Sequence, residues 1–294
     1  MTTDYVGRFP SEAVRQEYIR GYDRLLAEHW PPLTVTTDVP TSFGTTRVHR
    51  SGQECGVPLV LLPGSGGAPL LFRGLVHQLS AAHPVFAVEA IGEPGHHHQD
   101  KPVRDGRDLA DWLVEVLDGL GVARASLVGS SYGAWTAIHT ALHAPERVAS
   151  ISLLDPPGFE QVGVRFVSWA MACSAFFGAP REMREWAARS LTNAALTEDW
   201  LMPLAPAMFA FRRVLPNPPV FTDEELLGLS VPSLFLLGER SQMHDSALAR
   251  QRLEGMSSVT RVEVLPGTGH SMSLDDPETV LARVLEFVGS LVRA

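Results

Sequence analysis

The chain has 294 residues, enough for one α/β domain with an insertion or for two small domains. Its formal net charge of −9 argues against nucleic acid and against anionic membrane surfaces as partners. Hydrophobic residues make up 45% of the chain and charged residues 19%, as expected for an ordinary soluble globular protein.

The beginning of the chain is expected to form an amphipathic helix. Between Ser11 and His29, large apolar side chains recur at helical spacing, at Val14, Tyr18, Tyr22, Leu25 and Leu26. Ser11 is placed to cap this helix, and Pro31-Pro32 to end it. We therefore interpret residues 1–32 as an N-terminal extension that lies on the main body.

From residue 33 onward, predicted strands and helices alternate. Thr34–Pro40 and Gly44–Arg50 are rich in β-branched residues and predict an antiparallel pair at a sheet edge. The later strands are apolar, as expected for strands covered on both faces: Pro58–Leu62, Val85–Val88, Ala125–Val128, Val148–Leu154, Val231–Leu237 and Val262–Leu265. The helices between and after them are Leu70–Ala81, Leu109–Leu120, Ala134–Leu142, Ser246–Gly255 and Pro277–Leu291. This order predicts a mostly parallel, doubly wound sheet formed by residues 33–158 and 223–294.

Residues 159–222 interrupt this alternation and are expected to form a helical cap. Helices are predicted near Val162–Phe177, Arg181–Leu191 and Asp199–Val214. The segment is rich in large apolar side chains, enough to line an apolar pocket: Phe159, Phe166, Trp169, Met171, Phe176, Phe177, Met208 and Phe211.

The segment Gly129–Gly133 has the G-x-S-x-G pattern of a nucleophile elbow. In this motif the central serine lies on a sharp turn between a strand and a helix, so the residues two positions away must be small. Gly129 and Gly133 meet this requirement for Ser131, whereas Ser130 has larger residues at those positions. The alternative is an ordinary strand–turn–helix joint whose serine only caps the helix.

Ligands of doubly wound sheets bind at the carboxyl ends of the strands. Several polar residues of this chain fall at such ends: Ser65, Ser131, Asp155, Ser241 and His270. A serine hydroxyl is a weak nucleophile at neutral pH and needs a neighbouring base, a task that suits the pKa of histidine. Of the eleven histidines, His270 stands out because it lies in a Gly-rich loop after the last predicted strand.

This arrangement resembles the α/β-hydrolase superfamily of serine esterases and lipases. The resemblance extends from about Val35 to the C-terminus and is carried, in the family's order, by Leu61–Ser65, Gly129–Gly133, Leu236–Glu239 and Gly267–His270. It implies the α/β-hydrolase fold with an inserted cap, Ser131 as the nucleophile and His270 as the base.

The resemblance also implies an oxyanion hole made of two backbone N–H groups. One belongs to Tyr132, the residue after the nucleophile, and similarity assigns the other to Ser65 in the loop after Pro58–Leu62. The chain departs from the common His-Gly form of this loop, since Pro63 stands in place of the histidine. A backbone donor does not depend on the missing side chain.

The acid of the triad is not at its usual place. In most members of the family it lies three residues beyond the glycine that ends the strand Val231–Leu237, and Ser241 occupies that position here. Asp155, at the end of the strand after the elbow helix, is the favoured replacement, although Asp-Pro also commonly starts a turn. Asp245 is the alternative acid, although its natural role is to cap the next helix, and Glu239 is a third candidate.

No cofactor and no metal site are expected. His96-His97-His98 are adjacent and cannot all face one ion from a regular element, so a solvated loop at a pocket rim is preferred for them. Cys55 and Cys173 are far apart and fit neither a disulfide framework nor a metal site, which favours a reducing cytoplasm. Neither a signal peptide pattern nor an apolar stretch long enough to cross a bilayer is present in the sequence, so no membrane partner is expected.

The leading hypothesis is a serine hydrolase that cleaves a carboxylic ester, thioester or lactone of an apolar small molecule through an acyl-enzyme. Serine rather than aspartate at the elbow argues against dehalogenase and epoxide hydrolase chemistry. Two alternatives remain open. One is a C–C bond hydrolase, acyl transferase or cyclase on the same fold, and the other is a binding protein without catalysis, which only Ser241 supports. The sequence does not indicate the oligomeric state.

Overall fold

The computed structural model describes residues 5–66, 68–256 and 261–292. Gly67, the last residue of the predicted loop Pro63–Gly67, lies outside the described residues, as do both ends of the chain.

The described residues form one nine-stranded sheet with the order β1-β2-β4-β3-β6-β7-β8-β9, and the short β5 pairs with β2. The pairs of β2 with β1, β4 and β5 are antiparallel, and the remaining pairs are parallel. The predicted parallel sheet with an antiparallel edge is therefore confirmed. The strands are β1 (Val35–Thr41), β2 (Gly44–Gly52), β3 (Leu59–Leu62), β4 (Pro84–Val88), β5 (His98–Gln99), β6 (Ala125–Ser130), β7 (Val148–Leu154), β8 (Ser233–Gly238) and β9 (Arg261–Leu265).

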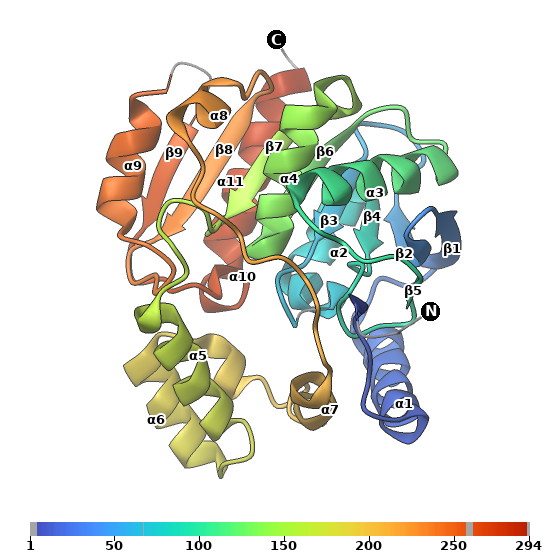
Figure 1. The fold of residues 1–294 in the computed structure, drawn as a ribbon, viewed down its shortest axis with the longest axis vertical. Coiled ribbons are helices and arrows are strands. Elements are labelled where there is room, and N and C mark those ends of the chain that lie inside the picture. The colour runs from blue at the N-terminus through green and yellow to red at the C-terminus, as the bar shows by residue number, and fades with distance from the viewer. Residues whose placement is uncertain (1–4, 67, 257–260, 293–294) are drawn as a thin grey trace.

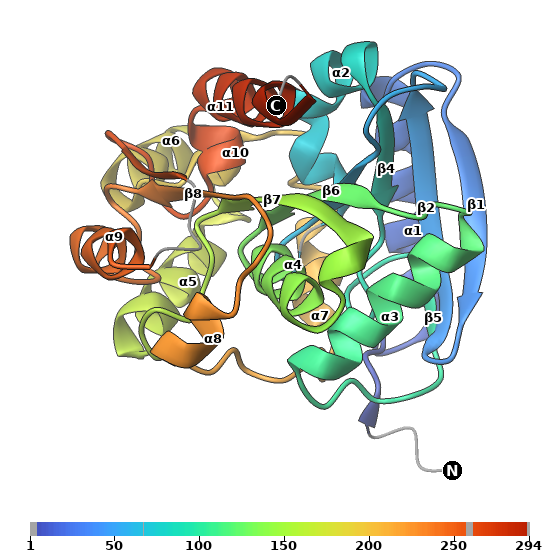
Figure 2. The ribbon, with the colours of Figure 1, turned by 90° about the horizontal axis from the view of Figure 1, so that it is seen from above.

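Helices cover both faces of this sheet (Figure 2). One buried apolar cluster contains residues of α3, α4 and α9, and a second contains residues of α2 and α11 on the opposite face. These helices are α2 (Arg73–Ala82), α3 (Gly106–Gly119), α4 (Tyr132–His143), α9 (Ser246–Glu254) and α11 (Pro277–Val292). Shorter helical segments are η2 (Pro69–Phe72), η3 (Pro145–Arg147), α8 (Asp223–Leu227) and α10 (Met272–Asp275).

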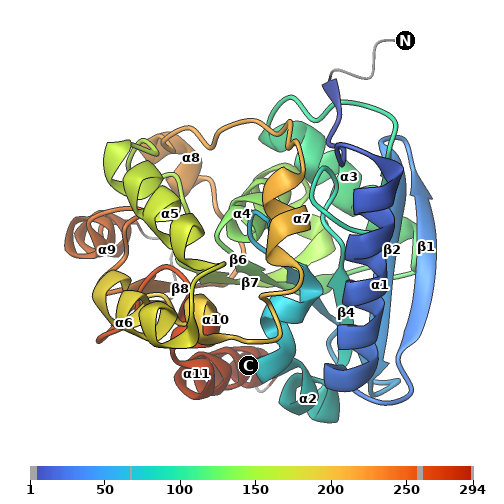
Figure 3. The same ribbon diagram turned by 90° about the horizontal axis from the view of Figure 1, so that it is seen from below.

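The N-terminal helix α1 (Glu12–His29) lies alongside the antiparallel edge of the sheet and beside α7 (Ala205–Ala210), as Figure 3 shows. The Ser11 hydroxyl accepts a hydrogen bond from the backbone N–H of Val14, which confirms the predicted cap. Tyr18, Tyr22 and Leu25 are buried and belong to the same apolar cluster as α2 and α11.

Between β7 and β8 the chain leaves the sheet and forms a helical insert, residues 159–222. Its helices α5 (Val164–Phe176), α6 (Arg181–Leu191), η4 (Ala194–Thr197) and α7 lie apart from the helices on the faces of the sheet (Figure 1). The prediction of a long helix over Asp199–Val214 is wrong, because only Ala205–Ala210 is helical. Pro203 and Pro206 explain the late start of this helix, since proline is accepted in the first turn of a helix but not in its interior.

No helix among the described residues is both long enough and apolar enough to cross a membrane.

Candidate active site

Ser131 lies on a sharp turn between β6 and α4. Its φ of 51° falls in the left-handed region, which is uncommon for residues other than glycine. A Cβ atom on Gly133 would lie 2.1 Å from the carbonyl oxygen of Leu62, and one on Gly129 would lie 2.5 Å from the carbonyl oxygen of Gly133. Both positions therefore require glycine. The Ser131 side chain makes no capping hydrogen bond to α4, so the structure does not support the alternative of a capping serine.

His270 follows β9 and lies between Ser131 and Asp155. Its Nε2 is 2.9 Å from Ser131 Oγ, and its Nδ1 is 2.6 Å from Asp155 Oδ2. Because an ionised carboxylate only accepts hydrogen bonds, Nδ1 carries the proton and Nε2 is free to accept the serine proton. Three side chains predicted from different strand ends thus form one hydrogen-bonded chain.

Asp155 is completely buried and has several hydrogen-bond donors. Oδ1 accepts from the backbone N–H of Gly238 at 3.0 Å, and Oδ2 accepts from the Ser241 hydroxyl at 2.6 Å. Ser241, at the position where the resemblance places the acid, therefore donates a hydrogen bond to the Asp155 carboxylate.

His244 lies against the other side of the same carboxylate. Its Nε2 is 3.5 Å from Asp155 Oδ1, and its ring is fully buried. Burial acts to raise the pKa of Asp155, but the neighbouring His244 and the contacts with His270 and Gly238 outweigh it and hold that pKa below its ordinary value. Burial also lowers the pKa of His244, although Asp155 acts in the opposite direction. Asp155 is thus kept ionised although its side chain is fully buried.

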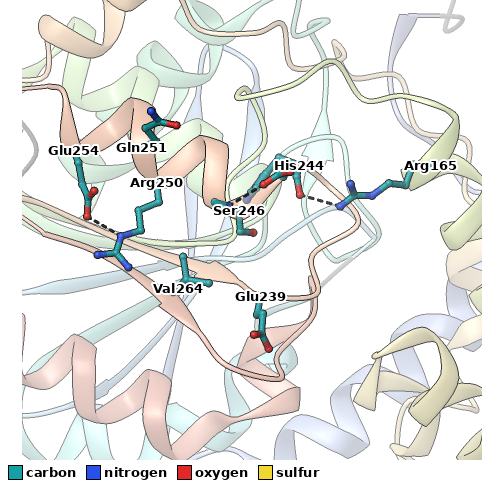
Figure 4. A pocket seen from close by; sticks show the side chains of 10 residues that line it. Arg165, Glu239, His244, Ser246, Arg250, Gln251, Glu254 and Val264 are labelled. Carbon is teal, nitrogen blue, oxygen red and sulfur yellow. Dashed lines mark hydrogen bonds and ion pairs between the residues drawn. The ribbon is translucent and has the colours of Figure 1, made fainter.

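The other two acid candidates lie elsewhere. Asp245 caps α9, since its carboxylate accepts hydrogen bonds from the backbone N–H groups of Ala247 and Leu248. It lines a separate cavity of about 550 Å³ (Figure 4), whose wall includes His244 and Arg165 but not Ser131. Glu239 accepts a hydrogen bond from the backbone N–H of Gly267.

A cavity of about 100 Å³ opens at Ser131, and both predicted oxyanion residues, Ser65 and Tyr132, line it. As the first residue of α4, Tyr132 has a backbone N–H that no carbonyl of its own helix can accept. The rest of the wall is mainly apolar and includes Val162, Phe166, Leu215, Pro216 and Met243. Phe166 and Trp169 of α5 also pack edge-on against the His270 ring, with centroids 5.2 and 6.0 Å away.

The sequence did not point to Glu93 and Arg213, which lie next to this cavity. Glu93 Oε2 accepts a hydrogen bond of 2.8 Å from the backbone N–H of Gly66, the residue after Ser65. Glu93 Oε1 is 3.2 Å from Arg213 Nη1, and Arg213 lines the cavity. Burial raises the pKa of Glu93 to about 7, although Arg213 and the hydrogen bonds from Gly66 and Ser65 lower it. No motif links these residues, which lie 120 positions apart.

The side chains of the three adjacent histidines lie in different surroundings. His96 Nε2 is 2.6 Å from Asp23 Oδ1, His98 Nε2 is 3.0 Å from Asp100 Oδ1, and His97 lines a cavity near the N-terminal segment. His98 begins the two-residue strand β5, which the prediction of a loop missed. Within the part of the chain that the structure describes, no group of three or more His, Cys, Asp and Glu side chains is arranged to hold a metal ion.

Comparison with known proteins yields matches over most of the chain. The sequence model described as "Alpha/beta hydrolase family" matches residues 59–284. A Bacillus subtilis (strain 168) protein named "Uncharacterized carboxylesterase nap" is 29% identical over 283 residues, 92% of this chain and 91% of the relative. The crystal structure of carboxylesterase CesB (YbfK) from Bacillus subtilis is similar, with a TM-score of 0.83, 26% identity and coverage of 95% of this chain and 99% of that one. The crystal structure of naproxen esterase (carboxylesterase NP) from Bacillus subtilis has a TM-score of 0.81 at 28% identity, covering 92% and 97%.

Proposed function

The chain belongs to the alpha/beta hydrolase family, and from this premise we propose that it is a serine carboxylesterase with the catalytic triad Ser131, His270 and Asp155. The observation that carries the proposal is the hydrogen-bonded chain from Ser131 Oγ through the His270 ring to Asp155. The similarity to proteins named carboxylesterases over more than nine-tenths of the chain supports the reaction class.

In the proposed mechanism, Ser131 Oγ attacks the ester carbonyl while His270 Nε2 takes its proton. Buried Asp155 holds the ring in the required tautomer and stabilises the imidazolium that forms. The backbone N–H groups of Tyr132 and Ser65 stabilise the oxyanion. His270 then protonates the leaving alcohol, and water, activated by the same histidine, hydrolyses the acyl-enzyme.

The substrate is proposed to be an apolar small-molecule ester. The apolar wall of the Ser131 cavity supports this class, and the helical insert would act as a cap over the cavity. Thioesters and lactones follow the same chemistry. A C–C bond hydrolase or acyl transferase is less favoured, because the matches over nearly the whole chain carry carboxylesterase names. A non-catalytic protein is also less favoured. That alternative rested on Ser241 in place of the usual acid, but His270 has a carboxylate partner in Asp155.

Labelling with a fluorophosphonate tests the proposal directly. We expect intact-mass analysis to find one adduct on the wild-type protein and none on Ser131→Ala, because only an activated serine reacts. The wild type should also hydrolyse p-nitrophenyl butyrate, with activity lost in the variant. A folded wild type that neither forms the adduct nor hydrolyses the ester would refute the proposal.

We also propose the cytoplasm as the compartment. The supporting observation is that Cys55 is exposed and Cys173 buried, and both are free.

A further inference from the structure

Glu93 is a buried carboxylate directly behind the proposed oxyanion hole. Its side chain is only 2% exposed, and its Oε2 accepts the backbone N–H of Gly66 at 2.8 Å. Gly66 adopts a positive φ of 68°, a region that glycine enters readily, so the loop after β3 has little conformational stiffness of its own at this point. A fixed acceptor for Gly66 therefore restricts the orientation of the preceding residue, Ser65.

Arg213 holds the other oxygen of the same carboxylate from the helical insert. Its Nη1 is 3.2 Å from Glu93 Oε1, and its side chain is 42% exposed where it lines the Ser131 cavity. The segment that carries it is held at two further points. Arg212 and Arg8 exchange backbone hydrogen bonds of 2.8 and 3.0 Å, and the Tyr132 hydroxyl donates to the Pro216 carbonyl at 3.1 Å.

We infer that Glu93 is a positioning residue of the oxyanion hole and that Arg213 couples it to the insert. Its carboxylate joins the loop that supplies the Ser65 donor to the segment that closes the cavity. The oxyanion hole then reaches its working geometry only when the insert is seated on the core. This inference rests on the proposed esterase function and adds a role that lies outside the triad.

The physical basis is the geometric demand of oxyanion stabilisation. A donor must lie about 2.7–3.1 Å from the position that the oxyanion will occupy, and it contributes little when displaced. A substrate carbonyl is held much less strictly than the transition state. Loss of the Glu93 contacts should therefore lower kcat more than it changes KM.

Steady-state kinetics on p-nitrophenyl butyrate provide the test. Glu93→Ala removes the acceptor for Gly66 and the partner of Arg213, and we expect kcat to fall tenfold to a hundredfold with KM changed less than threefold. Glu93→Gln keeps a carbonyl acceptor for Gly66, so it should recover most of the lost kcat. Asp108→Asn is the matched control, because Asp108 is also a buried carboxylate paired with an arginine, Arg104, but does not line the Ser131 cavity.

A Glu93→Ala enzyme with kcat within twofold of the wild type, or with its loss confined to KM, would overturn the inference. If Glu93→Ala does not fold, a double-mutant cycle of Glu93→Asp, whose shorter side chain cannot reach both Gly66 and Arg213, and Arg213→Gln decides. If the double variant loses less kcat than the two single variants' losses combined, the coupling is supported. Losses that combine additively on a logarithmic scale overturn it. Fluorophosphonate labelling separates a failure of the proposed esterase function from a failure of this inference. An unlabelled wild type refutes the esterase function, whereas a labelled wild type together with Glu93 variants of unchanged kcat refutes only the role of Glu93.

Discussion

The pairing of β7 with β8 explains why a triad acid can lie at the end of either strand. β7 and β8 are parallel partners in register, with Leu154 opposite Leu236, so their carboxyl ends are adjacent. The backbone N–H of Asp155 donates to the Leu236 carbonyl at 2.8 Å, and its carboxylate accepts from Ser241 in the loop after β8. A carboxylate from β7 can therefore reach the same imidazole nitrogen as one from the β8 loop.

This geometry predicts a clear ranking of two substitutions. In Asp155→Asn the amide cannot stabilise the imidazolium, and it favours the wrong tautomer of His270, so kcat should fall by a factor on the order of 10³ or more. Asp245→Asn should leave kcat within about twofold, because an asparagine side chain can still cap α9. The kcat of both variants on an activated ester is the measurement, and the reverse ranking would contradict the assignment of Asp155.

At the scale of single residues, the sequence predicted the positions that motifs define. Ser131 and His270 lie within hydrogen-bonding distance, as their places at strand ends suggested. The choice between Asp155 and Asp245 could not be made from spacing, because both follow strands and both have an ordinary structural role. Burial and side-chain direction distinguish the two residues and favour Asp155, and both depend on the packing of the whole sheet. Glu93 gave no signal beyond a charge in a Gly-rich loop.

At the scale of elements, apolar periodicity predicted the strands and most of the helices to within a few residues. The missed helix α8 had a usable signal, since Thr222 and Glu225 form a capping box. The overlong prediction at α7 ignored two prolines. The two-residue strand β5 and the four-residue α10 had no comparable pattern, because elements this short depend on contacts with distant residues.

Helix α4 carries a histidine, His139, that should make the stability of the folded protein depend on pH. His139 is 8% exposed, and neither of its ring nitrogens has a hydrogen-bond partner among the described residues. Burial lowers its pKa to about 4, with a smaller contribution from His143. The folded protein therefore keeps this ring neutral, while the unfolded chain binds a proton below about pH 6.5. The stability tied to neutral His139 is present above that pH and is lost as the pH falls toward 4.

His139→Phe should remove this loss. The free energy of unfolding of the wild type is expected to fall relative to that of the variant by up to about 3 kcal/mol between pH 6.5 and pH 4. Urea denaturation at several pH values measures the free energy of unfolding of both proteins. Subtracting one from the other cancels the contributions of the other titratable groups. His77→Phe is the control, because His77 is exposed on a different helix, α2. Parallel pH profiles for the wild type and His139→Phe would contradict the prediction.

At the scale of the whole molecule, the helical insert is fastened to the core beside the candidate site. Arg165 of α5 donates to the backbone carbonyls of Ser241 and His244, the latter at 2.9 Å, as Figure 4 shows for His244. The cavity at Ser131 is about 100 Å³, smaller than the roughly 300–1,000 Å³ of typical ligand sites. A bulky ester would therefore require the insert to move away from the core before it could reach Ser131.

Arg165→Ala should make that movement easier, because it removes charged hydrogen bonds between the insert and the core. We expect the kcat/KM for a p-nitrophenyl ester of a bulky aromatic acid, divided by that for p-nitrophenyl acetate, to rise several-fold. The quotient cancels any common loss caused by the proximity of Arg165 to Ser241. Arg181→Ala is the matched control, since Arg181 pairs with Glu185 and Asp199 inside the insert. An equal quotient in the two variants, or a lower one in Arg165→Ala, would show that this contact does not limit access to Ser131.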